Sequence, residues 1–174
     1  FTLFGLYVEA RGGSSALLGL ASAVAAISEL PVFFWGGRLV GWVGSRRLYA
    51  VALGVFALRA VLYLVVPSAE WILAVQVLHG LSFGFYLVAA MALLHERVGP
   101  ERLATAQGLV ASAMAGGQIV GALFGGAVLE RFGTLPVYSL SALVLLGALA
   151  VFIGGGRRLE GTPVGELGGT EHPR

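Results

Sequence analysis

Long apolar segments separated by short polar turns dominate the chain. Five of these segments have lengths near the roughly 20 residues that cross a bilayer as a helix. The sequence therefore predicts five spans, at residues 17–35, 48–66, 71–94, 103–129 and 137–153. A sixth apolar run, residues 1–8, is too short to span. We interpret it as the end of a truncated helix, and we expect a missing part upstream.

The segments between the apolar runs predict loops and a tail. Residues 38–47 read as a basic loop, residues 95–102 as a charged loop broken by Pro100, and residues 130–136 as a turn. The sequence is polar and rich in Gly from residue 154 onward. We therefore predict one transmembrane bundle over residues 1–155 and a disordered tail over residues 156–174.

Composition supports an all-α integral membrane protein. Hydrophobic residues make up 57% of the 174 positions and charged residues only 11%, whereas soluble domains are about a quarter charged. The absence of Cys excludes disulfides and thiolate metal sites. The net charge is +2, but the arginines form no patch interleaved with aromatic residues. We therefore predict no nucleic-acid partner and no cofactor.

The distribution of arginine predicts the orientation in the membrane. Alternating spans place eight arginines on one side and only Arg11 and Arg131 on the other. The eight are Arg38, Arg46, Arg47, Arg97, Arg102, Arg157, Arg158 and Arg174. Because positive loops stay in the cytoplasm, we expect a multi-pass inner-membrane protein with a cytoplasmic C-terminus.

Two segments of the chain match each other without gaps. When Gly19 is placed on Gly108, small residues coincide along both spans and Glu29 falls on Gln118. Further matches are Gly36 with Gly125, Gly37 with Gly126, and Gly44 with Gly133. The two spans cross in opposite directions, as in the inverted repeats of secondary transporters. Chance agreement between two Gly-rich spans is the alternative interpretation.

Three ionisable residues lie inside the predicted spans. At about 1.5 Å per residue, Glu29 lies roughly 18 Å into its span, and Arg59 and His79 lie at a similar depth. Such residues are expensive in a membrane and indicate function by default. We expect one polar cavity, in which Glu29 binds a proton or a polar solute. The alternative for Glu29 and Arg59 is a structural ion pair without substrate contact.

His79 shares a predicted helix face with other side chains that suit a solute. Gln76, Phe83 and Tyr86 are spaced to lie on the same face. We expect His79 and Gln76 to donate hydrogen bonds into a wet cavity. A metal site is not predicted, because no second ligand lies at the required spacing in this span.

Two glycine patterns have alternative interpretations. Residues 80–84 match G-x-S-x-G, the pattern of a serine nucleophile on a sharp strand-to-helix turn. Here the pattern lies within a long helical run, so we predict that the protein is not an enzyme. Gly117, Gly121 and Gly125 form a ridge of small residues, for which helix packing is the default explanation.

Two segments resemble the G-x-x-x-D-R-x-G-R-R loop motif of the major facilitator superfamily. Motif positions are occupied by Gly37, Arg38, Gly44, Arg46 and Arg47 in one segment, and by Gly126, Glu130, Arg131 and Gly133 in the other. Gly41 and Trp42 replace the Asp-Arg pair, so the usual charge latch is not expected at the first loop. The resemblance implies six helices, the first truncated, from the C-terminal half of a twelve-helix fold, built as two inverted three-helix repeats. It also implies a missing N-terminal half.

The chain resembles the lactose-permease-like symporters, which include nucleoside and phenylpropionate permeases, in one pattern of charged and polar residues. This pattern places Glu29, Arg59 and His79 on successive spans. This resemblance implies proton-coupled symport of a small polar or aromatic-acid solute by alternating access. The expected site for substrate and proton consists of Glu29, Arg59, His79, Gln76, Gln118 and Tyr86. In lactose permease a carboxylate follows the histidine by three residues, whereas this chain has Ser82. Proton-antiport efflux of amphipathic compounds is the alternative function.

Overall fold

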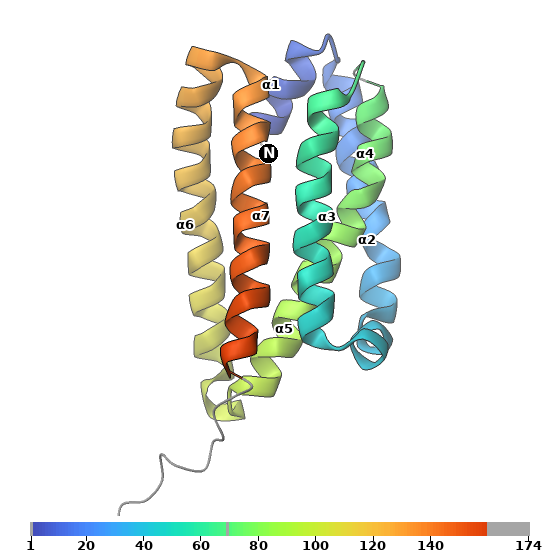
Figure 1. Cartoon of the computed structure of the whole chain (residues 1–174). Coiled ribbons are helices and arrows are strands. Elements are labelled where there is room, and N and C mark those ends of the chain that lie inside the picture. Colours follow the sequence, from blue (N-terminus) through green and yellow to red (C-terminus); the bar gives the residue numbers. More distant parts are fainter. Residues whose placement is uncertain (1, 69, 160–174) are drawn as a thin grey trace, which may run out of the picture.

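A computed structural model describes residues 2–68 and 70–159 of the chain, and all regular structure in this part is helical. The elements are α1 (Thr2–Ala10), α2 (Ser15–Val43), α3 (Ser45–Val65), α4 (Trp71–His79), the π-helix η1 (Gly80–Gly84), α5 (Phe85–Arg97), α6 (Pro100–Phe132) and α7 (Thr134–Leu159). The long helices stand side by side in one upright bundle (Figure 1). The prediction of an all-α membrane bundle is confirmed.

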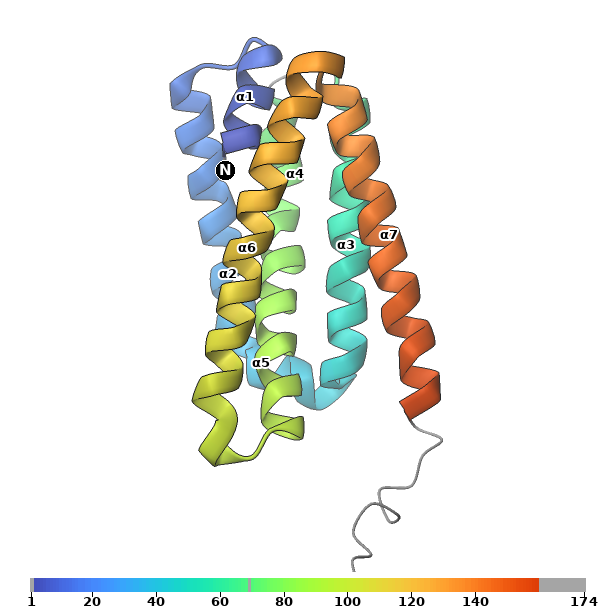
Figure 2. The same ribbon diagram turned by 90° about the vertical axis from the view of Figure 1, so that its left-hand side faces the viewer.

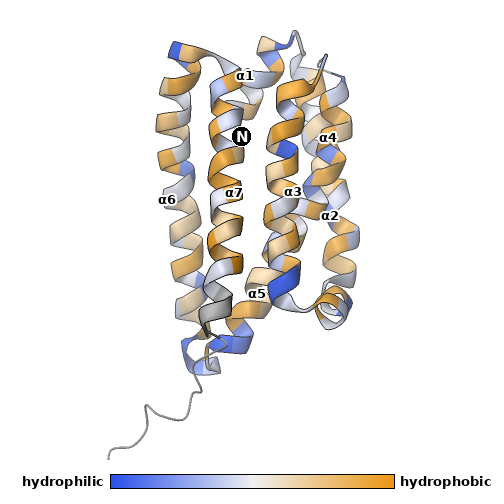
Figure 3. Ribbon diagram, in the orientation of Figure 1, coloured by the Kyte–Doolittle hydropathy of each residue, from blue (hydrophilic) through white to orange (hydrophobic). Residues whose placement is uncertain are grey.

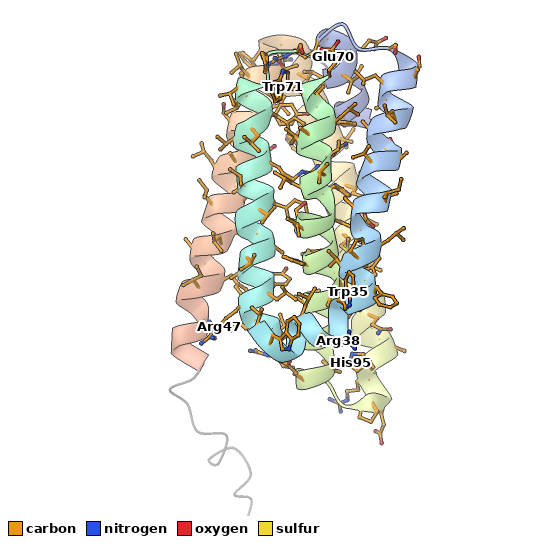
Figure 4. All side chains as sticks on the ribbon, turned by 90° about the vertical axis from the view of Figure 1, so that its right-hand side faces the viewer. Trp35, Arg38, Arg47, Glu70, Trp71 and His95 are labelled. Carbon is orange, nitrogen blue, oxygen red and sulfur yellow. The ribbon has the colours of Figure 1, made fainter. Side chains whose placement is uncertain are left out.

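Five described helical segments are long and apolar enough to cross a membrane. Four of them are α2, α3, α6 and α7, and the fifth combines α4, η1 and α5. Successive segments run in opposite directions, so chain reversals alternate between the two ends of the bundle (Figures 1 and 2). Arg38, Arg47 and His95 lie at one end, and Glu70 and Trp71 lie at the other (Figure 4). Figure 3 shows apolar residues along the lengths of the helices between these ends.

The basic loop predicted at residues 38–47 is helical instead. α2 continues to Val43 and α3 begins at Ser45, so Gly44 alone separates the two helices. Gly44 has a φ of 84°, a left-handed conformation that favours glycine. The prediction was wrong because Arg38 lies in the last two turns of α2, whereas Arg46 and Arg47 lie in the first turn of α3. Charged residues at a membrane boundary do not require a loop.

The other predicted loops are also shorter than expected. Pro100 starts α6 rather than breaking a helix, since the first helical position needs no backbone N–H donor. Gly133, with a φ of 79°, separates α6 from α7. α7 continues to Leu159, so residues 156–159 extend a helix that was predicted to end earlier. The remaining residues of the predicted tail, 160–174, lie outside the described residues.

A parallel, close contact joins α2 to the segment formed by η1 and α5. A Cβ atom on Gly80 would lie 1.9 Å from the Ser28 carbonyl oxygen, and one on Gly84 would lie 2.9 Å from a Val32 methyl carbon. Farther along, a Cβ on Gly36 would lie 3.0 Å from a Val88 methyl carbon. Glycines therefore set the distance between these helices, as small residues commonly do in membranes.

α6 differs from the other spans because it contributes no buried residue to the described bundle. Gly117 and Gly121 have no atom within 4 Å of an added Cβ. Within residues 2–68 and 70–159, the predicted ridge therefore has no helix packed closely against these two glycines. Helix packing of this ridge stays a prediction.

We predict that Gly80→Ala destabilises the complete protein by roughly 1–3 kcal/mol, the usual cost of forcing extra atoms into a packed interior. The added methyl group would collide with the Ser28 backbone, which cannot rotate away. Gly54→Ala is the matched control, because nothing lies within 4 Å of its added Cβ. The thermal unfolding midpoints of the purified variants in detergent test this prediction. Equal midpoints for the two variants would contradict it.

Candidate functional site

The Arg59 guanidinium occupies the centre of a polar cluster inside the bundle. α3 carries Arg59, and the side chain is buried with only 8% of the residue exposed. Nη1 donates to His79 Nδ1 at 3.0 Å and to Ser82 Oγ at 2.9 Å. Nη2 donates to Gln76 Oε1 at 2.8 Å and to Tyr63 Oη at 3.3 Å. One guanidinium thus organises side chains from α3, α4 and η1.

Gln76 and Tyr63 form the side of the cluster toward one end of the bundle. Tyr63 Oη donates to Gln76 Oε1 at 3.3 Å, and both side chains are buried. Because arginine can only donate, the oxygen of the Gln76 amide must face Arg59. The backbone carbonyl of Tyr63 accepts a 2.6 Å hydrogen bond from the Tyr7 hydroxyl. This bond ties α1 to the same cluster.

His79 connects Arg59 to Glu29. His79 Nε2 lies 3.1 Å from Glu29 Oε1. Since Arg59 donates to His79 Nδ1, that nitrogen accepts and carries no proton. The proton of the neutral ring therefore lies on Nε2, where it is donated to the carboxylate of Glu29. The three ionisable residues predicted at one depth form a single chain of hydrogen bonds.

The partners of Arg59 differ from the structural ion pair that the sequence left open as an alternative. The hydrogen-bond acceptors of the Arg59 side chain in the described residues are all uncharged. Arg59 Nε is buried without a hydrogen-bond partner. His79 contacts both Arg59, through Nδ1, and Glu29, through Nε2.

Two consecutive residues of α2 hold the histidine and the π-helix in place. Ser28 Oγ accepts a 2.9 Å hydrogen bond from the Gly80 amide and donates to the Ala25 carbonyl at 2.6 Å. The neighbouring Glu29 bonds to His79. A π-helical turn is rare and occurs often at functional sites. The close approach at Gly80 is what brings Ser28 and Glu29 within reach of this turn.

The G-x-S-x-G pattern has a structural explanation. Ser82 is fully buried, accepts from Arg59, and donates to the His79 carbonyl at 3.1 Å. Its two flanking glycines pack against α2. The residues form a π-helix rather than a strand-to-helix turn. The geometry of a serine nucleophile is therefore absent from this described segment.

Two predicted site residues lie outside the hydrogen-bonded cluster. Gln118 is exposed on α6 and lines a groove of about 740 Å³ with α7. Tyr86 packs against Tyr49, with ring centroids 5.4 Å apart. The sequence repeat matched Gln118 with Glu29, but a sequence match does not show which face of the bundle either side chain occupies.

The motif residues lie at helix ends. Arg46 is at the start of α3, with its guanidinium carbon 5.8 Å from the centroid of the Phe152 ring. Arg38 and Arg47 are exposed at the same end of the bundle. In the second segment, Glu130 and Arg131 are exposed near the end of α6. Gly37 and Gly126 lie within helices, whereas Gly44 and Gly133 make the turns.

Sequence reasoning missed Tyr63 and Ser28 as members of the site. Tyr63 follows Arg59 by one helical turn, a spacing that could have indicated contact. Ser28 gave no such signal, because its role depends on the distance between α2 and η1.

Comparisons with known proteins agree with this architecture. The chain is 32% identical over 155 residues to the maltose permease of Geobacillus stearothermophilus, covering 86% of this chain and 39% of that protein. It is 31% identical over 116 residues to a multidrug resistance protein B homolog of Mycobacterium tuberculosis, covering 60% of this chain and 21% of that protein. It is 23% identical over 141 residues to the quinolone resistance protein NorA of Staphylococcus aureus, covering 81% of this chain and 36% of that protein.

The chain thus spans less than half the length of these relatives. No solved structure gives a significant match. The model of the MFS_1 like family matches residues 1–140. The chain therefore belongs to the MFS_1 like family of the major facilitator superfamily.

Proposed function

We propose that the chain contributes one helix bundle to a proton-coupled symporter for a small polar or aromatic-acid solute. The observation that carries the proposal is the hydrogen-bonded chain from Arg59 through His79 to Glu29. Ionisable residues retained at membrane depth commonly mark substrate or proton pathways. The chain covers 39% of the maltose permease, so the solute path would run between this bundle and the rest of such a transporter.

The exposure of the cluster suggests a division of roles. The side chains of Glu29 and His79 are 18% and 20% exposed, whereas Arg59, Gln76 and Ser82 are buried. We infer that a proton or a solute meets Glu29 and His79. Arg59 holds the histidine in place and supplies positive charge behind it. In this proposal Gln76 is no longer among the residues that contact the solute, because its buried side chain orients Arg59 instead.

Glu29 is the proposed proton carrier. It is the one carboxylate in the middle of a described span, and Ser82 cannot titrate in its place. Protonation of Glu29 removes the negative charge that faces the His79 N–H. In this proposal, that loss weakens the contact between α2 and α4 and frees His79 to bond the solute. Movement between the two halves then exposes the site to the other side of the membrane.

We place the bundle in the inner membrane with the end that carries Arg38, Arg47 and His95 in the cytoplasm. The support is the excess of arginine at this end, which follows the positive-inside rule. Proton-antiport efflux is the second candidate function. The names of two relatives point to drug resistance, and Phe83 and Tyr86 lie beside the polar cluster with ring centroids 6.4 Å apart.

We predict that Glu29→Gln lowers pH-gradient-driven transport at least tenfold, since the amide cannot take up and release the proton. Maltose, 3-phenylpropionate and norfloxacin are the solutes to test with the complete protein in membrane vesicles. Symport gives uptake into right-side-out vesicles with acid outside, whereas antiport gives accumulation in everted vesicles with acid inside. Glu70→Gln, at the exposed end of the bundle, is the matched control. Undiminished coupled transport in Glu29→Gln would refute the proposed role.

We predict that Arg59→Lys lowers the stability of the complete protein by about 1.5–3 kcal/mol, the usual range for one hydrogen bond to a charged group. A lysine ammonium is compact and cannot reach both pairs of acceptors that the arginine fork contacts. Thermal unfolding in detergent measures the effect, and Arg47→Lys at an exposed position is the control. Identical unfolding midpoints for the two variants would show that the fork is dispensable.

A further inference from the structure

A cavity of about 820 Å³ lies among α3, α5, α6 and α7. Its lining includes none of Glu29, Arg59 or His79. The cavity is close to the arginine-rich end of the bundle, because its lining begins at Arg46 in the first turn of α3 and reaches Arg97 at the end of α5. Its volume falls within the roughly 300–1,000 Å³ that is typical of ligand pockets in proteins.

Two charged side chains, those of Arg46 and Arg97, belong to the described lining of the cavity. Both are positive. Ser45 Oγ donates to Glu96 Oε2 at 2.8 Å. This bond ties together the residues that directly precede the two arginines, so it holds both arginines at one rim. Arg46 Nη2 also donates to the backbone carbonyl oxygens of Phe152 and Ile153, at 3.4 Å and 3.5 Å.

The interior of the cavity is aromatic and aliphatic. Tyr49 packs against Phe152 and Tyr86, with ring centroids 4.7 Å and 5.4 Å away. Leu94 and Met114 line the cavity from α5 and α6. A ligand that fits has an anionic group near the arginines and a hydrocarbon chain that lies along these side chains. A free polar anion would leave the apolar lining unfilled.

The position of the cavity in the bundle identifies the source of such a ligand. The end with Arg38, Arg47 and His95 (Figure 4) is the end that we place at the cytoplasmic surface. Anionic lipids give this surface of the membrane its negative potential, and basic pockets between helices on this side bind their head groups.

We propose that this cavity is a binding site for an anionic phospholipid, with the phosphate between Arg46 and Arg97 and an acyl chain against Tyr49, Tyr86 and Phe152. The site goes beyond the transport function and rests only on the proposed orientation. It also adjoins the polar cluster, because Tyr86 neighbours Phe83 and the Phe83 ring stacks on His79 with centroids 5.5 Å apart. The lipid thus contacts a row of aromatic rings that ends at the candidate transport site.

The test is native mass spectrometry of the complete protein, released from detergent with added phosphatidylglycerol or phosphatidylcholine. We expect selective retention of phosphatidylglycerol. The double variant Arg46→Gln/Arg97→Gln should lower this retention on the order of tenfold or more, given the known contribution of each basic residue near an anionic surface. The double variant Arg47→Gln/Arg102→Gln changes exposed arginines at the same end that do not line the cavity, and it should retain the lipid.

A second pair of variants tests whether the lipid occupies the cavity, without changing the charge of the protein. The two variants add the same side chain to the same helix, so they also control for an effect on folding. Ala113 lines the cavity, whereas Ala111 on the same helix does not. Ala113→Phe should expel the lipid, and Ala111→Phe should leave it bound. Equal retention of the two lipids, equal retention by all variants, or displacement by inorganic phosphate alone would overturn the proposal. A change in solute selectivity of Ala113→Phe with lipid retention intact would also overturn it. The result is independent of Glu29→Gln, which should lose coupling and keep the lipid.

Discussion

The buried guanidinium of Arg59 is the group on which the rest of the site depends. A charged side chain at membrane depth is costly unless its donors are satisfied. The two terminal nitrogens of Arg59 donate to four uncharged acceptors from α3, α4 and η1, whereas Nε has no partner among the described residues. These bonds fix the orientation of the Gln76 amide and the tautomer of His79. The His79 proton is thereby directed at Glu29, so the buried Arg59 side chain influences how the more exposed carboxylate of Glu29 is bound.

Glycine makes this arrangement possible. The contact at Gly80 brings the backbone of α2 so close that no larger residue fits, and Ser28 then satisfies the Gly80 amide at the π-helical turn. The turn places His79 and Ser82 together on Arg59. The polar contacts of the site therefore depend on helix packing, because a change in the distance between α2 and η1 alters the Glu29–His79 contact.

The sequence predicted the spans, their alternation and the shared depth of Glu29, Arg59 and His79, because apolar length and helical rise determine these properties. It did not predict the helix ends, since polar helix ends such as that at Arg38 resemble loops. The partner of Glu29 was also not predictable. Depth follows from residue number, but the direction of a side chain around its helix depends on packing, here on the register between Gly80 and Ser28. Gln118 shows the same limit, since it lies on an exposed face of α6.

The arrangement of Arg59, His79 and Glu29 in one hydrogen-bonded chain can be tested by nitrogen-15 NMR of the histidine-labelled complete protein. The His79→Gln variant assigns the resonance. We expect a neutral His79 ring with its proton on Nε2, and a shift of this Nε2–H resonance in Glu29→Gln. A proton on Nδ1 would rule the arrangement out, because Arg59 could then no longer donate to that nitrogen.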